Sequence, residues 1–175
     1  KGNKTMLLIL DLDGTILDSQ KQHINSFVKA IKKAGLYAGK DIIEGIKKRM
    51  GRPGKELLEE VFPEANKVTI KILLASAKQI MIKEEFDNVG LLPTVKSFLK
   101  KNNKKHSFAL ATSANKTFAI KMLEKFNIRK YFDVILTADD LDKPKPDPEI
   151  LLRILEKTGV DKKDVIFFGD TIYDY

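Results

Sequence analysis

Four short apolar segments recur along the chain, and each has the length of a β-strand. They lie at residues 6–10, 108–111, 134–136 and 165–168. Their hydrophobic positions are continuous rather than alternating, which is typical of strands that are buried on both faces of a parallel sheet. We therefore expect these four segments to form a parallel sheet in the core of the protein.

Helical patterns separate the later strands. Apolar residues recur at helical spacing over residues 94–101 and 117–126, and a third helix is predicted over residues 148–158. This third helix opens with Pro148 and stops before Gly159, which suits a helix start and end. Strands that alternate with helices predict an α/β fold with a Rossmann-like parallel sheet.

Residues 19–89 break this alternation because they have helical patterns throughout. Turn signals divide them into four predicted helices, at residues 20–34, 41–50, 55–62 and 65–86. We therefore predict two domains. Residues 1–18 and 90–175 form the α/β core, and residues 19–89 form a small α-helical cap domain inserted after the first strand.

Composition excludes several classes of protein. The chain has 175 residues, of which 43% are hydrophobic, so it can bury a sizeable core. It has no cysteine, which excludes thiolate catalysis, zinc–thiolate sites and iron–sulfur clusters. No apolar run approaches the roughly 18 residues that a membrane helix needs. We expect a cytoplasmic protein that does not bind membranes.

The chain is basic, with 32 Lys and Arg against 24 Asp and Glu and a formal net charge of +8. Such a surplus can indicate binding to nucleic acid. Here, however, the lysines are spread through helical stretches with interleaved glutamates, as in residues 55–60, and few aromatic residues accompany them. We therefore interpret them as solvated helix surface and expect no nucleic-acid partner.

Carboxylates and a hydroxyl follow three of the predicted strands, namely Asp11 with Asp13, then Thr112, then Asp170. Ligands of open parallel sheets bind beyond the carboxyl ends of the strands, so we expect these side chains to share one crevice. With Asp174 they bring four carboxylates together, which repel one another unless a cation or a proton separates them. Oxygen ligands without His or Cys suit Mg²⁺. The site is thus predicted to perform phosphoryl chemistry.

Each of these residues has a predicted role. Asp11 attacks phosphorus and forms an aspartyl-phosphate, while Asp13 acts as general acid and base. Thr112 donates a hydrogen bond to the phosphoryl group, and Lys143 neutralises its oxygens. Asp174 is expected to hold a metal-bound water or to orient the lysine.

Four motifs in the same order resemble those of the haloacid dehalogenase superfamily, at residues 11–15, 110–113, 143–147 and 169–174. Within it, the chain is similar to phosphatases with a small helical cap, such as phosphoglycolate phosphatase, and to β-phosphoglucomutase. The resemblance implies an Mg²⁺-dependent phosphatase with the metal held by Asp11, Asp13 and Asp170, with Asp13 contributing its backbone carbonyl. Dehalogenases of this superfamily lack the second carboxylate, so Asp13 favours phosphate-ester hydrolysis.

Some residue assignments have competitors. Ser113 competes with Thr112 as the phosphoryl donor, and we favour Thr112 on its register after the strand. Lys145 competes with Lys143, and the family pattern, which places the lysine before the first proline, favours Lys143. Arg52 in the helical insertion is a candidate for binding a second negative charge of the substrate, although solvated helix charges explain its presence equally well.

The resulting hypothesis is a hydrolase of phosphomonoesters that acts on a small phosphorylated metabolite, with phosphoglycolate phosphatase as the nearest label. A sugar phosphomutase and a non-catalytic relic of the fold are the alternatives. Members of the superfamily continue after the residue equivalent to Asp174 with a helix and a further strand. Because the chain stops at Tyr175, we expect this C-terminal strand and helix to be missing.

Overall fold

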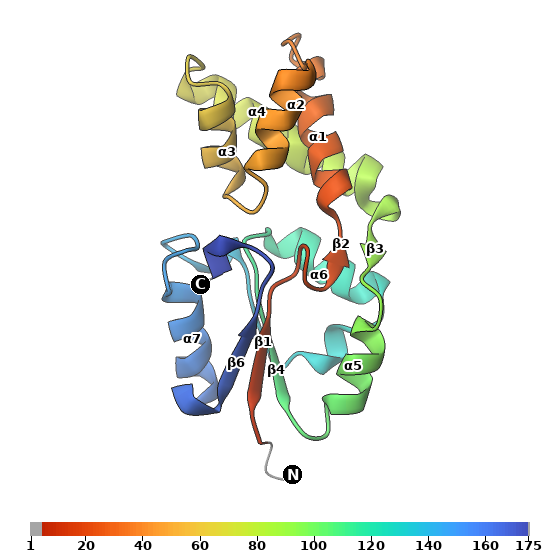
Figure 1. The fold of residues 1–175 in the computed structure, drawn as a ribbon, viewed down its shortest axis with the longest axis vertical. Coiled ribbons are helices and arrows are strands. Elements are labelled where there is room, and N and C mark those ends of the chain that lie inside the picture. The colour runs from red at the N-terminus through yellow and green to blue at the C-terminus, as the bar shows by residue number, and fades with distance from the viewer. Residues whose placement is uncertain (1–4, 175) are drawn as a thin grey trace. The chain divides into compact units, whose positions relative to one another are not determined.

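The computed structural model describes residues 5–174 and divides the chain into two compact units (Figure 1). One unit contains the residues up to Asp18 and those from Leu91 on, and the other is Ser19–Gly90. The first is an α/β unit and the second is entirely helical apart from one residue of a short strand.

The α/β unit contains a sheet of four parallel strands, β1 (Leu7–Leu10), β4 (Ser107–Ala111), β5 (Val134–Leu136) and β6 (Val165–Phe168). Their order in the sheet is β5-β4-β1-β6. All four coincide with the apolar segments of the sequence to within one residue, so the predicted Rossmann-like α/β fold is confirmed. Leu10 lies opposite Leu110 and Phe168, so three strands end at one level.

Helices cover both faces of this sheet (Figure 1). On one face, α7 (Glu149–Thr158) contributes Ile150 and Ile154 to a buried apolar cluster that includes Leu7 and Ile9 of β1. The other face carries α5 (Val95–Asn102) and α6 (Lys116–Lys125). There the Phe98 ring of α5 meets the Phe108 ring of β4 edge to face, with 5.9 Å between their centroids. The two covered faces explain why the strands are apolar at every position.

Short elements complete this unit. The two-residue strands β2 (Leu17–Asp18) and β3 (Gly90–Leu91) pair where the chain passes between the units. They are too short to leave a hydrophobic pattern, and the sequence did not predict them. Single 3₁₀ turns lie at η3 (Arg129–Tyr131), η4 (Ala138–Asp140), η5 (Lys162–Asp164) and η6 (Ile172–Asp174).

The helical unit contains α1 (Gln20–Lys33), α2 (Lys40–Lys48), α3 (Gly54–Val61) and α4 (Lys67–Ile80). Each helix contributes apolar side chains to one core. The buried members of this core are Phe27, Ala30, Ile31, Ile46, Leu57, Leu58, Ile70, Leu73, Ala77 and Ile80. The helical unit therefore has a hydrophobic core of its own, distinct from that of the sheet.

The predicted helix over residues 65–86 is wrong in its bounds. It begins two residues later because the Asn66 side chain accepts a hydrogen bond from the Thr69 N–H and caps the helix. After Ile80 the α-helix is followed by a π-helical segment, η1 (Met81–Glu85), and then by a 3₁₀ turn, η2 (Phe86–Asn88). Hydrophobic periodicity does not distinguish a π-helix or a 3₁₀ turn from an α-helix.

Among residues 5–174, no helix is long and apolar enough to cross a membrane.

The helical core predicts how two substitutions to alanine differ. Ile31 is fully buried in this core, whereas Val68 of α4 is 66% exposed. Ile31→Ala should lower the free energy of unfolding by about 2–5 kcal/mol, because it removes buried methyl groups and leaves a cavity. Val68→Ala should change it by less than about 0.5 kcal/mol. Urea unfolding followed by circular dichroism measures both values, and equal effects would contradict the assigned core.

Candidate functional site

The chain leaves β1, β4 and β6 at the same edge of the sheet, and the polar residues that the sequence singled out follow there. The ladder continues for one residue beyond the strands, since the Asp11 N–H donates to the Phe168 carbonyl at 2.9 Å. In the same way, the Thr112 N–H donates to the Leu136 carbonyl at 3.1 Å. These bonds fix the backbone of Asp11 and Thr112, so the Cα atoms that carry the two side chains are held in place.

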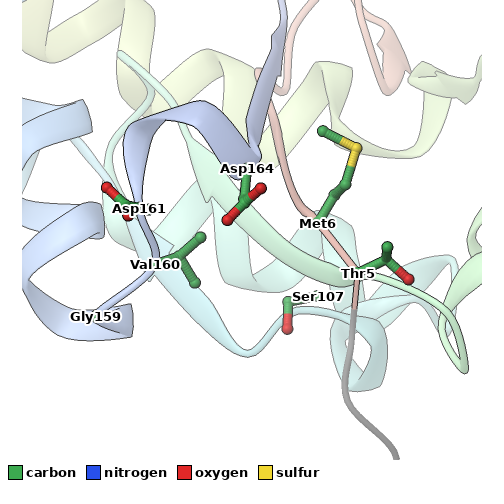
Figure 2. Close-up of a pocket in the computed structure, with 7 residues that line it drawn as sticks. All are labelled: Thr5, Met6, Ser107, Gly159, Val160, Asp161 and Asp164. Carbon is green, nitrogen blue, oxygen red and sulfur yellow. The ribbon is translucent and has the colours of Figure 1, made fainter.

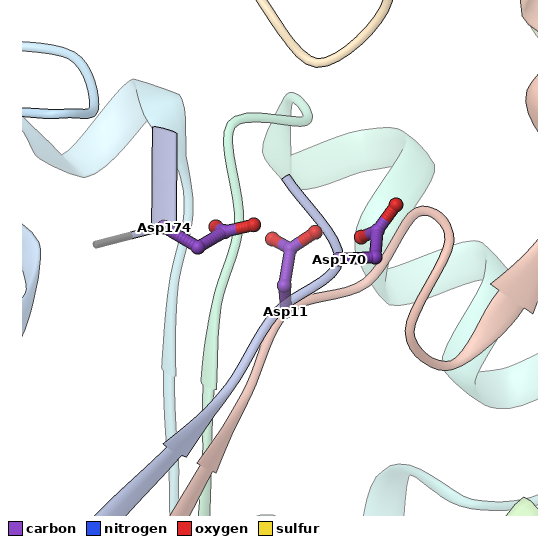
Figure 3. A group of neighbouring side chains, drawn as sticks. All are labelled: Asp11, Asp170 and Asp174. Atoms are coloured by element: carbon purple, nitrogen blue, oxygen red, sulfur yellow. The ribbon is translucent and has the colours of Figure 1, made fainter. Parts of the chain in front are cut away.

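Three carboxyl groups meet at this edge. Asp11, Asp170 and Asp174 each offer one oxygen, and these oxygens all lie within 4.8 Å of one another. Figure 3 shows the three groups side by side, with that of Asp11 between the other two. Asp11 and Asp174 are buried, whereas Asp170 is exposed. Among these three carboxyl groups, that of Asp170 is the one most in contact with solvent.

A buried lysine, Lys145, is bonded to two of these carboxylates. Its Nζ donates to Asp11 Oδ1 at 2.9 Å, to Asp174 Oδ1 at 2.8 Å and to the Ala111 carbonyl at 2.8 Å. An ammonium group has three protons, and each has an acceptor here. Only 6% of the Lys145 surface is exposed. The pairing compensates a cation that would otherwise be very unfavourable in this interior.

The two lysines of this loop lie in different environments. Lys143 was predicted to face the site, but its side chain is 72% exposed, and its Nζ lies 3.8 Å from Asp147 Oδ2. The lysine that reaches Asp11 is Lys145, the competitor that the family pattern disfavoured. The prolines on both sides of Lys145 gave no indication of this, because both lysines precede a proline.

Burial, hydrogen bonds and neighbouring charges shift the pKa values of these acids in different directions. Burial raises the pKa of Asp11 to about 7; the nearby Lys145 opposes this shift, and the charges of Asp13 and Asp174 add to it. Burial likewise raises the pKa of Asp170. Burial acts in the same sense on Asp174, but hydrogen bonds from Lys145 and Thr171 outweigh it and lower its pKa. Asp174 is thus held as the anion, whereas Asp11 needs further positive charge to stay ionised at neutral pH.

These observations fit a hard divalent cation. The three converging groups are all carboxylates, and oxygen donors of this kind suit Mg²⁺. Burial, with a smaller contribution from neighbouring carboxylates, raises the pKa values of Asp11 and Asp170, and a cation bound between them would favour their ionised forms. The residues present therefore fit the metal that the sequence predicted.

Gly14 allows the turn after Asp11 to pass close to Asp170. Its φ is +81°, in the left-handed region, and a Cβ at this position would overlap the Asp170 carboxyl group. The next residue, Thr15, donates its hydroxyl to Asp170 Oδ1 at 3.2 Å. The turn at Gly14 and Thr15, in the first motif, therefore fixes the position of the Asp170 carboxylate in the fourth motif.

The other predicted residues lie around this group. Asp13 is partly buried, and its charge raises the pKa of both Asp11 and Asp170. Thr112 is buried, and its Oγ1 accepts a hydrogen bond from the Ala114 N–H at 3.0 Å. Ser113, the alternative phosphoryl donor, is exposed.

Arg52 belongs to the helical unit, where it forms an ion pair with Glu60. The second oxygen of that carboxylate accepts from Arg49 Nε at 2.8 Å. Two guanidinium groups therefore share one carboxylate.

A second hollow lies at the opposite edge of the sheet (Figure 2). Its volume is about 400 Å³, and it is lined by Thr5, Met6, Ser107, Gly159, Val160, Asp161 and Asp164. Met6 and Asp164 directly precede β1 and β6, whereas Asp11 and Asp170 follow the ends of these strands. Because the strands are parallel, this hollow and the carboxylate group are at different ends, and none of the predicted site residues lines the hollow.

The close approach of Gly14 predicts how metal binding responds to a methyl group. Gly14→Ala and Gly159→Ala both place alanine at positive φ, which should cost each protein about 1–2 kcal/mol. Only the first also displaces the Asp170 carboxylate, because a Cβ at Gly159 would meet no atom within 4 Å. Titration calorimetry with Mg²⁺ should show about 10-fold or more weaker binding for Gly14→Ala alone. Equal Mg²⁺ affinity in both variants would show that Asp170 is not a ligand.

The chain is similar to known proteins. Residues 8–175 match the family described as haloacid dehalogenase-like hydrolase. A phosphorylated carbohydrates phosphatase of Thermotoga maritima is 29% identical over 168 residues, which cover 94% of this chain and 76% of that protein. A phosphoglycolate phosphatase of Nitrosospira multiformis is 28% identical over 184 residues, which cover 95% of this chain and 75% of that protein.

A solved hydrolase from Pseudomonas syringae superposes with a TM-score of 0.82 at 25% identity, covering 97% of this chain and 77% of that one. The family match extends over nearly the whole chain and includes all four motifs that carry the site. The chain belongs to the haloacid dehalogenase-like hydrolase family.

Proposed function

We propose that this protein is an Mg²⁺-dependent phosphatase that hydrolyses a small phosphomonoester through an aspartyl-phosphate on Asp11. The observation that carries the proposal is the pairing of buried Asp11 with Lys145 inside a group of three carboxylates. A nucleophilic carboxylate needs to be ionised and fixed in direction. Lys145 holds Asp11 Oδ1 and lowers the pKa of Asp11, and a bound cation would complete the ionisation. The phosphatases among the relatives support the same type of reaction.

Two displacements at phosphorus make up the proposed reaction. Asp11 Oδ1 accepts from Lys145, and we assign the attack to its second oxygen, Oδ2. As the bond from Oδ2 to phosphorus forms, the bond to the ester oxygen breaks, and Asp13 gives its proton to that oxygen. Asp13 then takes a proton from a water molecule, whose oxygen attacks phosphorus. The bond between phosphorus and Asp11 Oδ2 breaks as the bond to the water oxygen forms, so inorganic phosphate leaves and the Asp11 carboxylate is restored.

The remaining residues bind and orient the phosphoryl group. We assign to Lys145 the part that the sequence had given to Lys143, since its ammonium adjoins the attacking carboxylate. Thr112 and Ser113 are proposed to donate hydrogen bonds to the phosphoryl oxygens. Asp174 accepts a second hydrogen bond from Lys145 and so helps to hold its ammonium group.

Mg²⁺ would be held by Asp11 and Asp170 together with the Asp13 carbonyl. When bound, it supplies positive charge that stabilises the phosphoryl oxygens in the transition state. The Asp170 carboxylate is oriented for this task by the Thr15 hydroxyl. Asp174 accepts hydrogen bonds from Lys145 and Thr171 and lies beside the proposed metal ligands.

The proposed substrate is a small phosphorylated metabolite. One relative is named for phosphorylated carbohydrates and another for phosphoglycolate, and the latter is our first candidate class. We propose that the helical unit is the cap domain and that Arg52 recognises a second negative charge of the substrate. The cytoplasmic location stays a prediction.

The nucleophile predicts the effect of one isosteric change. Asp11→Asn should lower the rate of phosphate release by at least about 10³-fold, because an amide oxygen does not form the intermediate. Phosphate release is measured over a panel of sugar and small-acid phosphates with Mg²⁺, and again with EDTA, which should abolish it. Asp161→Asn, at the opposite edge of the sheet, is the matched control and should keep full activity. Similar rates for Asp11→Asn and the parent would remove the mechanism.

The two lysines of the loop predict opposite outcomes. Lys145→Ala should lower kcat by about 10²–10³-fold, because it removes the cation beside the nucleophile. Lys143→Ala should leave kcat within about twofold, since its side chain is exposed. Thermal unfolding of both variants checks that the activity measured belongs to folded protein. A larger loss in Lys143→Ala than in Lys145→Ala would restore the original assignment.

A further inference from the structure

The side chain of Glu149, the first residue of α7, holds the start of the loop that carries Lys145 by hydrogen bonds. Glu149 Oε1 accepts a hydrogen bond from the Asp142 N–H at 3.1 Å. Glu149 Oε2 accepts one from the Lys143 N–H at 2.8 Å. Both carboxylate oxygens therefore bind consecutive backbone amides, and this fixes the direction in which the chain approaches Lys145.

The loop contains several prolines, which lack a backbone N–H, so the two hydrogen bonds to Glu149 are a large share of its backbone hydrogen bonds. Residues 142–149 include prolines at 144, 146 and 148, so only five backbone amides remain as donors. Two of them bind the Glu149 carboxylate, as described. The Asp147 N–H donates to the Pro144 carbonyl at 3.1 Å, and the Glu149 N–H donates to Asp147 Oδ1 at 3.0 Å. Loss of the Glu149 acceptors would remove half of these four bonds.

Arg153, one turn further along α7, orients the Glu149 carboxylate. Its Nη2 lies 2.5 Å from Glu149 Oε1, and its Nη1 donates to the Asp140 carbonyl at 2.7 Å. The Asp142 N–H, with that of Lys143 and the charge of Arg153, holds the pKa of Glu149 below its usual range. The carboxylate is thus an anion at neutral pH and is able to accept both bonds.

Lys145 tolerates little displacement. Its ammonium has to meet Asp11 Oδ1, Asp174 Oδ1 and the Ala111 carbonyl at once, all at 2.8–2.9 Å. Groups of an active site must be held to within about 0.5 Å of their working positions. Lys145 lies two residues after the amide that Glu149 holds, so a shift of the loop entry moves its side chain too.

We propose that Glu149 is a positioning residue of the active site: by holding the Asp142 and Lys143 amides, it keeps the Lys145 ammonium on the Asp11 nucleophile. The proposal rests on the phosphatase function proposed above for its effect on turnover. It assigns to Glu149 no contact with the substrate.

The test is Glu149→Gln, which keeps the size of the side chain but leaves one acceptor oxygen and places an NH₂ group against a backbone N–H. We expect kcat for phosphate release to fall about 10- to 100-fold, as is typical when a supporting group of an active site is lost. KM should change by less than about twofold, because Glu149 does not bind substrate. Glu156→Gln, an exposed position on the same helix, is the control and should leave both constants unchanged.

A double-mutant cycle separates positioning from general stability. If Glu149 acts through Lys145, Glu149→Gln should lower kcat further by less than about twofold in a Lys145→Ala background. The proposal is overturned if kcat per folded molecule is unchanged in the single variant, or if the loss is the same in both backgrounds. Should Glu149→Gln not fold, Glu149→Asp keeps both oxygens on a shorter side chain and should give a kcat below the parent. A parental kcat in Glu149→Asp would then overturn it.

A second readout does not depend on finding a substrate. If the parent hydrolyses no phosphorylated compound, the proposed function fails, but the Lys145 ammonium can still be followed by NMR of ¹⁵N-lysine-labelled protein. We expect slow proton exchange of this group in the parent and in Glu156→Gln, and fast exchange in Glu149→Gln. Equally slow exchange in all three proteins would show that Glu149 does not position Lys145.

Discussion

A single buried ammonium group, that of Lys145, holds together the edge of the sheet where the chemistry is expected. Burial of an unpaired ammonium costs several kcal/mol, so its three acceptors are required for the fold as well as for any reaction. Two of them are carboxylates that would otherwise repel each other, those of Asp11 and Asp174. The interaction therefore joins the first strand, the loop before α7 and the turn after β6 in one network.

The parallel sheet makes this network possible. Because β1, β4 and β6 end at the same level, short extensions of the chain suffice to bring their next residues together. Glycines then permit the close approach. A Cβ at Gly14 would overlap Asp170, and one at Gly169 would lie 2.5 Å from Asp174 Cβ. The first and last motifs thus pack against each other with no room for larger residues.

Much of the fold and part of the site could be predicted from the sequence. Continuous apolar runs specify buried strands, and the polar residues that follow them locate the crevice, so Asp11 and Asp170 were expected at one place. The position of Lys145 beside Asp11 could not be predicted, because both lysines precede a proline and burial depends on the path of the loop. The role of Glu149 was also invisible, since a glutamate at a helix start has no pattern that reveals bonds to backbone amides. The π-helical segment after α4 could not be predicted either, because hydrophobic periodicity does not separate it from an α-helix.

The central claim is that Asp11 is the group that captures phosphorus. The most direct measurement is to quench the protein with acid during turnover of a phosphorylated substrate with Mg²⁺ and to reduce it with borohydride, which converts an aspartyl-phosphate into homoserine. Peptide mass spectrometry then locates the modified residue. The account predicts homoserine at position 11. Turnover accompanied by modification at a different residue would contradict it.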